Sequence, residues 1–225
     1  MKSKRLGLYV HIPFCLKKCN YCDFCSFADV DMSLRTRYVE RLCEEIASYR
    51  DRVENYRMES IFFGGGTPSL LVASEFEKIV RTIQDTFRPD GDIEFTVEAN
   101  PKTLTRDKLL LYRTLGVNRL SIGLQSIHER ELKSLGRIHN FEDFLSSLSL
   151  ARECGIHNIN VDIMYAIPEQ TVESFMKTVD TVTSLPITHI SAYSLIIEEN
   201  TPFGRIRDKL TLPTEDDELR MVDYL

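Results

Sequence analysis

HIPFCLKKCNYCDFC, residues 11–25, places four thiols within eleven positions: Cys15, Cys19, Cys22 and Cys25. Thiols this close together in one loop indicate a chelating or redox site. One alternative is a disulfide pair, which requires an oxidising compartment. A second is a tetrahedral zinc site with Cys25 as the fourth ligand. Both alternatives assign the loop a structural role.

A third alternative is an iron–sulfur cluster. The spacing Cys15-x3-Cys19-x2-Cys22 directly follows a strand-like segment, Leu6–Pro13. Three thiolates can hold three irons of a cubane [4Fe-4S] cluster and leave the fourth iron open. An open iron is a place for chemistry, so this alternative predicts a functional loop.

Composition limits the remaining choices. The chain has 225 residues, which suits one α/β barrel with a single core. A net charge of −6 provides no basic surface for nucleic acid, so we expect no nucleic-acid partner. The N-terminus does not resemble a signal peptide, and no apolar run approaches the roughly 20 residues of a membrane span. These features predict a reduced, soluble, cytoplasmic protein.

Short apolar runs rich in β-branched and aromatic residues predict six buried strands: Leu6–Pro13, Ile61–Gly64, Ile93–Val97, Arg119–Gly123, Ile159–Ile167 and His189–Ile197. Helical patterns alternate with these strands. The alternation implies parallel pairing through right-handed crossovers, in either an open doubly wound sheet or a barrel. Hydrophobic periodicity does not separate the two.

Two apolar stripes and one capped segment predict helices. The first stripe is Leu34, Tyr38, Leu42, Ile46 and Val53, and the second is Phe76, Ile79, Val80, Ile83 and Phe87. The capped helix has Asn140 as its N-cap and Gly155 just past its end. Cys43 and Cys154 fall within or at the end of predicted helices, where small core residues are the simplest interpretation.

Unusual residues gather at the predicted strand ends: Cys15–Cys25, Gly64–Pro68, Glu98–Pro101 and Gln125. Ligands of parallel α/β folds bind beyond the C-terminal ends of the strands. We therefore expect an active site there. Simpler interpretations are a tight turn at Gly64–Pro68 and structural or surface roles for the polar side chains.

The three-cysteine spacing, with an aromatic residue before the third cysteine, resembles the signature of radical S-adenosylmethionine (SAM) proteins. In that family the cluster's open iron is chelated by the methionyl group of SAM. One electron from the reduced cluster then cleaves the sulfonium to a 5′-deoxyadenosyl radical. The resemblance therefore implies a [4Fe-4S] cluster held by Cys15, Cys19 and Cys22, with SAM as the second cofactor.

Further motifs are similar to the group that contains oxygen-independent coproporphyrinogen III oxidases and heme chaperones: YVHIPFC (9–15), FGGGTPS (63–69), VEANP (97–101), SIGLQS (121–126), GRIH (136–139), VD (161–162) and EENTPF (198–203). The resemblance implies a partial (β/α)6 TIM-type barrel with parallel strands over residues 1–212. Thr214 predicts the cap of a further helix, so we expect residues 213–225 to begin a truncated C-terminal region.

The resemblance also implies roles for individual residues. Tyr9 and the segment Gly65–Gly66–Thr67 match positions at the methionine end of SAM, and Glu98 matches a position near its ribose. Four residues match positions around a second SAM described for the oxidase branch: Tyr21, Gln125, Arg137 and Asp162.

Three functional hypotheses follow. The first is a heme chaperone, which binds heme and delivers it to acceptor proteins, including membrane-associated ones. The second is a coproporphyrinogen III oxidase, which decarboxylates the propionates of its porphyrinogen substrate. Both require an electron-donor protein. The third is a structural module, with bound zinc or cluster, that does not turn over.

Two sequence features favour the chaperone. In the oxidase branch a further cysteine lies two positions after the third cluster cysteine, whereas this chain has Phe24 there. The oxidase branch also has a longer arm before the cluster motif. Cys25 matches neither branch, and its alternatives are a spectator, a heme–thiolate ligand or a redox-sensitive thiol. No histidine is singled out as a heme ligand.

Overall fold

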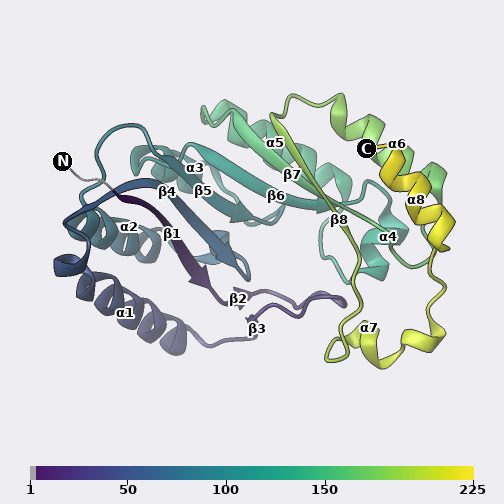
Figure 1. Cartoon of the computed structure of the whole chain (residues 1–225), viewed down its shortest axis with the longest axis horizontal. Helices are drawn as coiled ribbons and strands as arrows, with labels where there is room; N and C mark the ends of the chain where they lie inside the picture. Colours follow the sequence, from purple (N-terminus) through teal and green to yellow (C-terminus); the bar gives the residue numbers. More distant parts are fainter. Residues whose placement is uncertain (1–3) are drawn as a thin grey trace.

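The computed structural model describes residues 4–225 and contains one six-stranded parallel sheet (Figure 1). Its strands are β1 (Lys4–Ile12), β4 (Tyr56–Gly65), β5 (Glu94–Ala99), β6 (Arg119–Gln125), β7 (Asn158–Tyr165) and β8 (His189–Ser194). They lie side by side in chain order, β1-β4-β5-β6-β7-β8. A two-stranded ladder of β2 (Phe14–Cys15) and β3 (Phe27–Ala28) flanks the cysteine loop.

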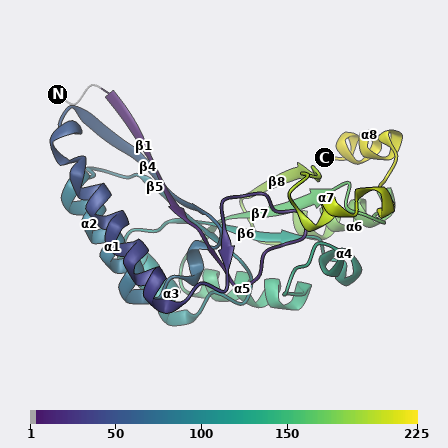
Figure 2. The ribbon, with the colours of Figure 1, turned by 90° about the horizontal axis from the view of Figure 1, so that it is seen from below.

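The strand order decides between the two folds that periodicity left open. A doubly wound sheet reverses its order at a switch point, which places helices on both faces. Here the order never reverses, so every right-handed crossover places its helix on the same face. Figure 2 shows the strands along the inside of a curved arc and helices α1, α2, α3 and α5 outside it. The sheet is a half-barrel, which confirms the predicted α/β fold of a partial barrel with parallel strands.

The helices follow the alternation that the sequence predicts. The α-helices are α1 (Met32–Ser48), α2 (Ala73–Phe87), α3 (Arg106–Thr114), α4 (Glu129–Ser134), α5 (Phe141–Glu153), α6 (Val172–Thr183), α7 (Pro202–Arg205) and α8 (Glu215–Asp223). Short 3-10 turns lie at Arg50–Arg52, Pro68–Leu70 and Arg207–Lys209.

The helix predictions differ in their accuracy. All five residues of the second stripe are buried in α2, and Asn140 caps α5 by accepting a hydrogen bond from the Asp143 N–H. The first stripe is partly wrong, because Leu34 is exposed and Val53 lies beyond the end of α1. The buried face of α1 is Val39, Cys43 and Ile46, so burial of Cys43 is confirmed.

Every strand prediction differs from the observed bounds at one end or both, and two differ by three residues or more. β4 begins at Tyr56, five residues before the predicted Ile61, because its first half pairs with Lys4–Gly7 of β1 beyond the densest core. β8 ends at Ser194, and Ile196 beyond it is exposed. The sequence predicted a buried strand to Ile197. Within residues 4–225, β8 lies at the end of the strand order, and its residues are half-buried or exposed.

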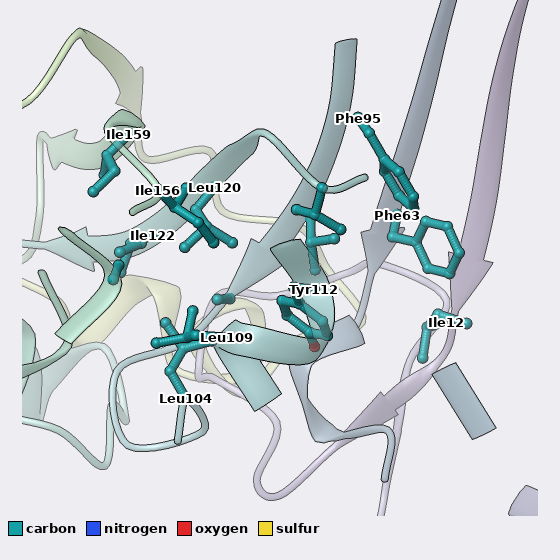
Figure 3. Packing of buried hydrophobic residues seen from close by; sticks show 14 of the residues in the cluster. Ile12, Phe63, Phe95, Leu104, Leu109, Tyr112, Leu120, Ile122, Ile156 and Ile159 are labelled. Carbon is teal, nitrogen blue, oxygen red and sulfur yellow. The ribbon is translucent and has the colours of Figure 1, made fainter. Parts of the chain in front are cut away.

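The core lies between the sheet and the outer helices (Figure 3). Phe76 of α2 packs between strand and helix aromatics, with its ring centroid 5.0 Å from Phe63 of β4 and 4.3 Å from Tyr112 of α3. All three side chains are fully buried. This packing holds the strand ends of β4 and β5, which carry site residues, in a fixed position.

The last helix, α8, packs against α6. Met221 is fully buried in the main core, and the Tyr224 hydroxyl donates to the Asp180 carboxylate at 2.7 Å. Thr214 accepts a hydrogen bond from the Asp217 N–H, so the predicted cap is present. A domain boundary at residue 212 stays a prediction. Within residues 4–225, no helix combines the length and the apolar character needed to cross a membrane.

Truncation of Phe76 tests this core. We expect Phe76→Ala to lower the free energy of unfolding by about 3–5 kcal/mol, because it leaves a cavity between buried rings. Leu110→Ala, at an exposed position of α3, is the matched control and should change it by less than about 0.5 kcal/mol. Urea denaturation followed by circular dichroism measures both. Equal losses in the two variants would contradict this description of the core.

Candidate functional site

The cysteine loop lies beyond the C-terminal end of β1 and crosses the open end of the half-barrel. The Phe27 N–H donates to the Pro13 carbonyl at 2.7 Å and closes the base of the loop. At its far side, Asn20 is held by three hydrogen bonds. Its N–H donates to the Leu135 carbonyl (2.9 Å), its side-chain amide donates to the Ser134 carbonyl (2.8 Å), and its carbonyl accepts from the Phe203 N–H (2.9 Å).

Gly136 allows this attachment. It follows Leu135 with φ of 75°, and a Cβ at this position would lie 3.0 Å from the Asn20 side chain. A larger residue would be strained in its backbone and would press on Asn20. The GRIH motif that begins at Gly136 therefore serves the loop that carries the thiols.

Side chains also hold the interior of the loop. The Lys18 ammonium donates to the carbonyls of Phe24 (3.0 Å) and Ser26 (3.4 Å), and His11 Nε2 donates to the carbonyl of Cys25 (2.7 Å). Backbone carbonyls of the loop therefore find partners without regular secondary structure.

The glycines at the end of β4 pack against the chain that enters the loop. A Cβ on Gly66 would lie 2.7 Å from the Phe14 carbonyl oxygen, and one on Gly65 would lie 2.6 Å from the His11 ring. Gly65 also has φ of 113°. Glycine is therefore required here by the close approach of the chain that enters the cysteine loop.

Beside the loop is a cavity of about 560 Å³, within the range of about 300–1,000 Å³ typical of small-molecule sites. Eleven of the twelve residues that the sequence singled out line it: Cys15, Cys19, Tyr21, Cys22, Gly65, Gly66, Thr67, Glu98, Gln125, Arg137 and Asp162. They come from the cysteine loop, from β5, β6 and β7, and from the turns that follow β4 and α4. The fold thus gathers at one site residues that lie far apart in the sequence.

Tyr9 does not line the cavity. Its side chain is 56% exposed on β1, and its hydroxyl lies 3.0 Å from His11 Nδ1. The ring stacks on Phe62 of β4, with centroids 6.1 Å apart. The direct contact with SAM that the resemblance implies for Tyr9 stays a prediction.

Gln125 enters the cavity through a backbone irregularity. The register between β6 and β7 shifts between Gly123 and Gln125, and Gln125 has φ of 74°, which is uncommon for a residue other than glycine. Bulges of this kind redirect side chains next to active sites. Gln125 is 7% exposed, and it lines the cavity.

Two carboxylates face the cavity from neighbouring regions of the sheet. Glu98 of β5 accepts a hydrogen bond from the Gly65 N–H at 3.2 Å, and Asp162 of β7 accepts from Ser121 and Asn160. Burial, together with the negative charge of Asp162, raises the pKa of Glu98 to about 7. Burial also raises the pKa of Asp162, against the effect of its hydrogen bonds. Neither is a solvated surface carboxylate.

Arg137 is not a solvated cation either. Its guanidinium donates to the Gly123 carbonyl at 2.6 Å and to the Asn100 side chain, and Nη1 lies 3.5 Å from the sulfur of Cys19. The sequence analysis placed Asn100 in the Glu98–Pro101 segment at a predicted strand end, where an active site was expected, but gave it no individual role.

Other lining residues also escaped the sequence analysis. Tyr193, Ser194, Ile196 and Glu198 close the side of the cavity next to β8, and Ser121 and Met164 line its wall. Tyr193 and Ile196 are 54% and 69% exposed. In the sequence they resemble core residues of a buried strand, because apolar side chains in a strand-like run predict burial. Their position at the mouth of the cavity was therefore not predicted.

The thiols divide into three groups. Cys15, Cys19 and Cys22 line the cavity, Cys43 and Cys154 are buried in the core, and Cys25 is exposed and is not among the lining residues. This arrangement does not support the zinc alternative, which needs Cys25 beside the other three.

The donor set at the cavity fits a cubane cluster. Within residues 4–225, no group of three or more Cys, His, Asp or Glu side chains is arranged to hold a single metal ion. A [4Fe-4S] cluster binds each thiolate through a different iron, so its ligands need no common centre. The three lining thiols, with room beside them for a further ligand, match this requirement.

Comparisons with known proteins agree with this geometry. The chain is 36% identical over 220 residues to the heme chaperone HemW of Bacillus subtilis, covering 96% of this chain and 58% of that protein. It is 37% identical over 204 residues to HemW of Escherichia coli, covering 91% and 54%. The chain thus spans little more than half the length of these curated relatives.

A solved structure has the same fold. Coproporphyrinogen III oxidase (HemN) from Escherichia coli, described as a radical SAM enzyme, superposes with a TM-score of 0.89 at 27% identity, covering 99% of this chain and 52% of that one. The family model described as the radical SAM superfamily matches residues 9–182. This chain therefore belongs to the radical SAM superfamily, and its family implies a [4Fe-4S] cluster and SAM as cofactors.

Proposed function

We propose that this chain forms the cofactor-binding barrel of a heme chaperone. The observation that carries the proposal is the meeting of Cys15, Cys19 and Cys22 with the expected SAM-contacting residues around one cavity. The similarity to two HemW heme chaperones supports the biological role. Delivery of heme to an acceptor protein, and reduction by an electron-donor protein, belong to the proposal.

We assign the cofactor contacts as follows. Cys15, Cys19 and Cys22 hold the cluster, which when bound supplies an electron to SAM. Gly65, Gly66 and Thr67 line the methionine side of the SAM site, where their backbone approaches the cysteine loop closely. Glu98, anchored by the Gly65 N–H, lies next to this turn and is suited to accept hydrogen bonds from ribose hydroxyls.

Tyr21, Gln125, Arg137 and Asp162 also line the cavity. We propose that they contact the same ligand or a second SAM molecule. Asp162 is held by Ser121 and Asn160, and Arg137 by the Gly123 carbonyl, so both charged groups are positioned before a ligand arrives. Such preorganisation lowers the entropic cost of binding.

The mouth of the cavity supports heme as the cargo. Phe24, Tyr193 and Ile196 are 68%, 54% and 69% exposed and line the same cavity. Exposed apolar side chains in a cluster mark binding surfaces, and a porphyrin offers a flat apolar face. Lys17 also lines this cavity and carries the charge that a heme propionate requires. Phe24 stands where the oxidase branch has a further cysteine, which favours the chaperone.

Removal of one thiolate tests cluster binding. After anaerobic reconstitution, Cys19→Ala should lose most of its iron and sulfide and its charge-transfer absorption, because two thiolates no longer hold the cubane. Cys25→Ala is the matched control and should keep the iron and sulfide content of the unaltered protein, since Cys25 does not line the cavity. A full complement in Cys19→Ala would refute the assigned ligand set.

Heme titration beside an oxidase assay tests the cargo. We expect the reconstituted protein to bind heme with a Soret absorbance change and to leave coproporphyrinogen III unchanged in the presence of SAM and a reductant. Ile196→Ser should weaken heme binding at least about tenfold, since burying one aliphatic side chain contributes about 1.5–3 kcal/mol. Leu219→Ser, on the exposed face of α8, is the control. Porphyrinogen turnover without heme uptake would assign the oxidase function instead.

The buried carboxylate Glu98 predicts a specific pH dependence of stability. In the unfolded chain its pKa is about 4.3, and in the fold it is about 7. Between these values the folded state binds more protons than the unfolded state, so stability falls as pH rises. Glu98→Gln has no carboxyl group to ionise, so its stability should not fall in this way. Between pH 4 and pH 8 its free energy of unfolding should rise by up to about 3 kcal/mol relative to that of the unaltered protein.

Urea denaturation of the cofactor-free protein across this pH range measures the effect of Glu98→Gln. Glu40→Gln, at an exposed position of α1, is the control and should follow the unaltered protein at every pH. If the free energy of unfolding changes with pH in the same way for Glu98→Gln and the unaltered protein, Glu98 keeps an ordinary pKa in the fold.

A further inference from the structure

A chain of hydrogen bonds connects two of the cavity thiols. The Thr67 hydroxyl lies 3.8 Å from the sulfur of Cys15 and accepts a hydrogen bond from Asn100 Nδ2 at 2.8 Å. Asn100 Oδ1 in turn accepts from Arg137, whose Nη1 lies 3.5 Å from the sulfur of Cys19. Thr67, Asn100 and Arg137 are named here the thiol-linking network, and Asn100 is its centre.

Hydrogen-bonding chemistry fixes the direction of each bond in this network. Arginine only donates, so the amide oxygen of Asn100 must face Arg137 and its amide nitrogen must face Thr67. The Thr67 oxygen accepts from that amide, which leaves its single proton for the sulfur of Cys15. The second bond of Arg137, to the Gly123 carbonyl at 2.6 Å, holds the guanidinium plane with Nη1 toward Cys19.

The surroundings are shaped to hold the network. A Cβ on Gly123 would lie 3.0 Å from Arg137 Nη2 and 3.3 Å from Asn100 Oδ1, so glycine in the middle of β6 leaves space for both groups. Glycine weakens a strand, and close approach of other groups is a reason to place it there. Thr67 is 3% exposed, so its hydrogen bonds face little competition from water.

A second, small void adjoins the network. It has a volume of about 30 Å³, room for about one water molecule, and Cys19, Thr67, Asn100 and Arg137 line both it and the large cavity. The thiol-linking network therefore forms part of the wall between the small void and the large cavity.

We propose that Asn100 is a positioning residue that directs one neutral and one cationic donor at the thiolates of Cys15 and Cys19, and so raises the midpoint potential of the bound cluster. The inference rests on the proposed cluster binding at these thiols. The reduced cluster carries one more negative charge than the oxidised cluster. Hydrogen-bond donors and positive charge near the sulfurs stabilise the reduced cluster. The reduction potential of iron–sulfur clusters depends on such hydrogen bonds.

Redox titration of the reconstituted protein tests this role. Titration without SAM, followed by the electron paramagnetic resonance signal of the reduced cluster, separates the potential from any effect on ligand binding. Asn100→Leu should shift the midpoint to more negative potential, because it frees both donors. Thr67→Val should give a smaller shift in the same direction. Thr67→Ser retains the hydroxyl and is the matched control, with the potential of the unaltered protein.

A double variant tests whether Asn100 acts through Thr67. The shift in Thr67→Val/Asn100→Leu should be smaller than the sum of the two single shifts, because both changes remove the same bond to Cys15. Additive shifts would overturn this connection.

The outcomes distinguish this inference from the proposed function. If Asn100→Leu contains full iron and sulfide but keeps the unaltered potential, the positioning role is wrong while the cluster site stands. If Asn100→Leu does not fold, the Thr67 pair decides, and equal potentials for Thr67→Val and Thr67→Ser overturn the proposal. If the unaltered protein takes up no cluster, the proposed function fails and the inference fails with it.

Discussion

Three hydrogen bonds at Asn20 hold the cysteine loop across the open end of the half-barrel, and the arrangement of the site depends on them. They join the loop to the end of α4 and to α7, which lie far away in the sequence. A loop rich in cysteines has little regular structure of its own. Its thiols share one cavity because the base of the loop is closed at Pro13 and Phe27, and its middle is attached through Asn20 to the end of α4 and to α7.

Several features of this site are locally unfavourable for stability. Gln125 has a left-handed backbone conformation, a glycine interrupts β6, and two carboxylates share a cavity in which burial opposes their charge. Features of this kind concentrate at functional sites and are maintained by the surrounding structure. Here the compensating structure is the aromatic core around Phe76 and the capped helices outside the sheet, which do not take part in the site.

The edge of the sheet at β8 forms one side of the cavity. Within residues 4–225, β8 ends the strand order, and Tyr193 and Ile196 are exposed where they line the cavity. The three thiols line the same cavity from the loop that follows β1, the strand at the other edge of the sheet. Residues from both edges of the sheet therefore meet around one cavity.

The sequence by itself determined the alternation of strands and helices, the capped ends of α5 and α8, and the chemistry of the cysteine loop, because these depend on local periodicity, capping residues and spacing. It also located most of the cavity lining, since parallel strands bring their C-terminal ends together. The exposed edge of β8, the end of α1 before Val53 and the separation of Tyr9 from the cavity were decided only by tertiary structure.

The physical reason is that each of these features depends on neighbours distant in the chain. Ile196 has the same side chain whether a strand covers it or solvent does. Asn100 looks like an ordinary turn residue until Thr67 and Arg137, which lie 33 and 37 positions away, fold against the nitrogen and the oxygen of its side-chain amide. Sequence pattern records what a side chain is able to do, and the packed fold determines which partner it meets.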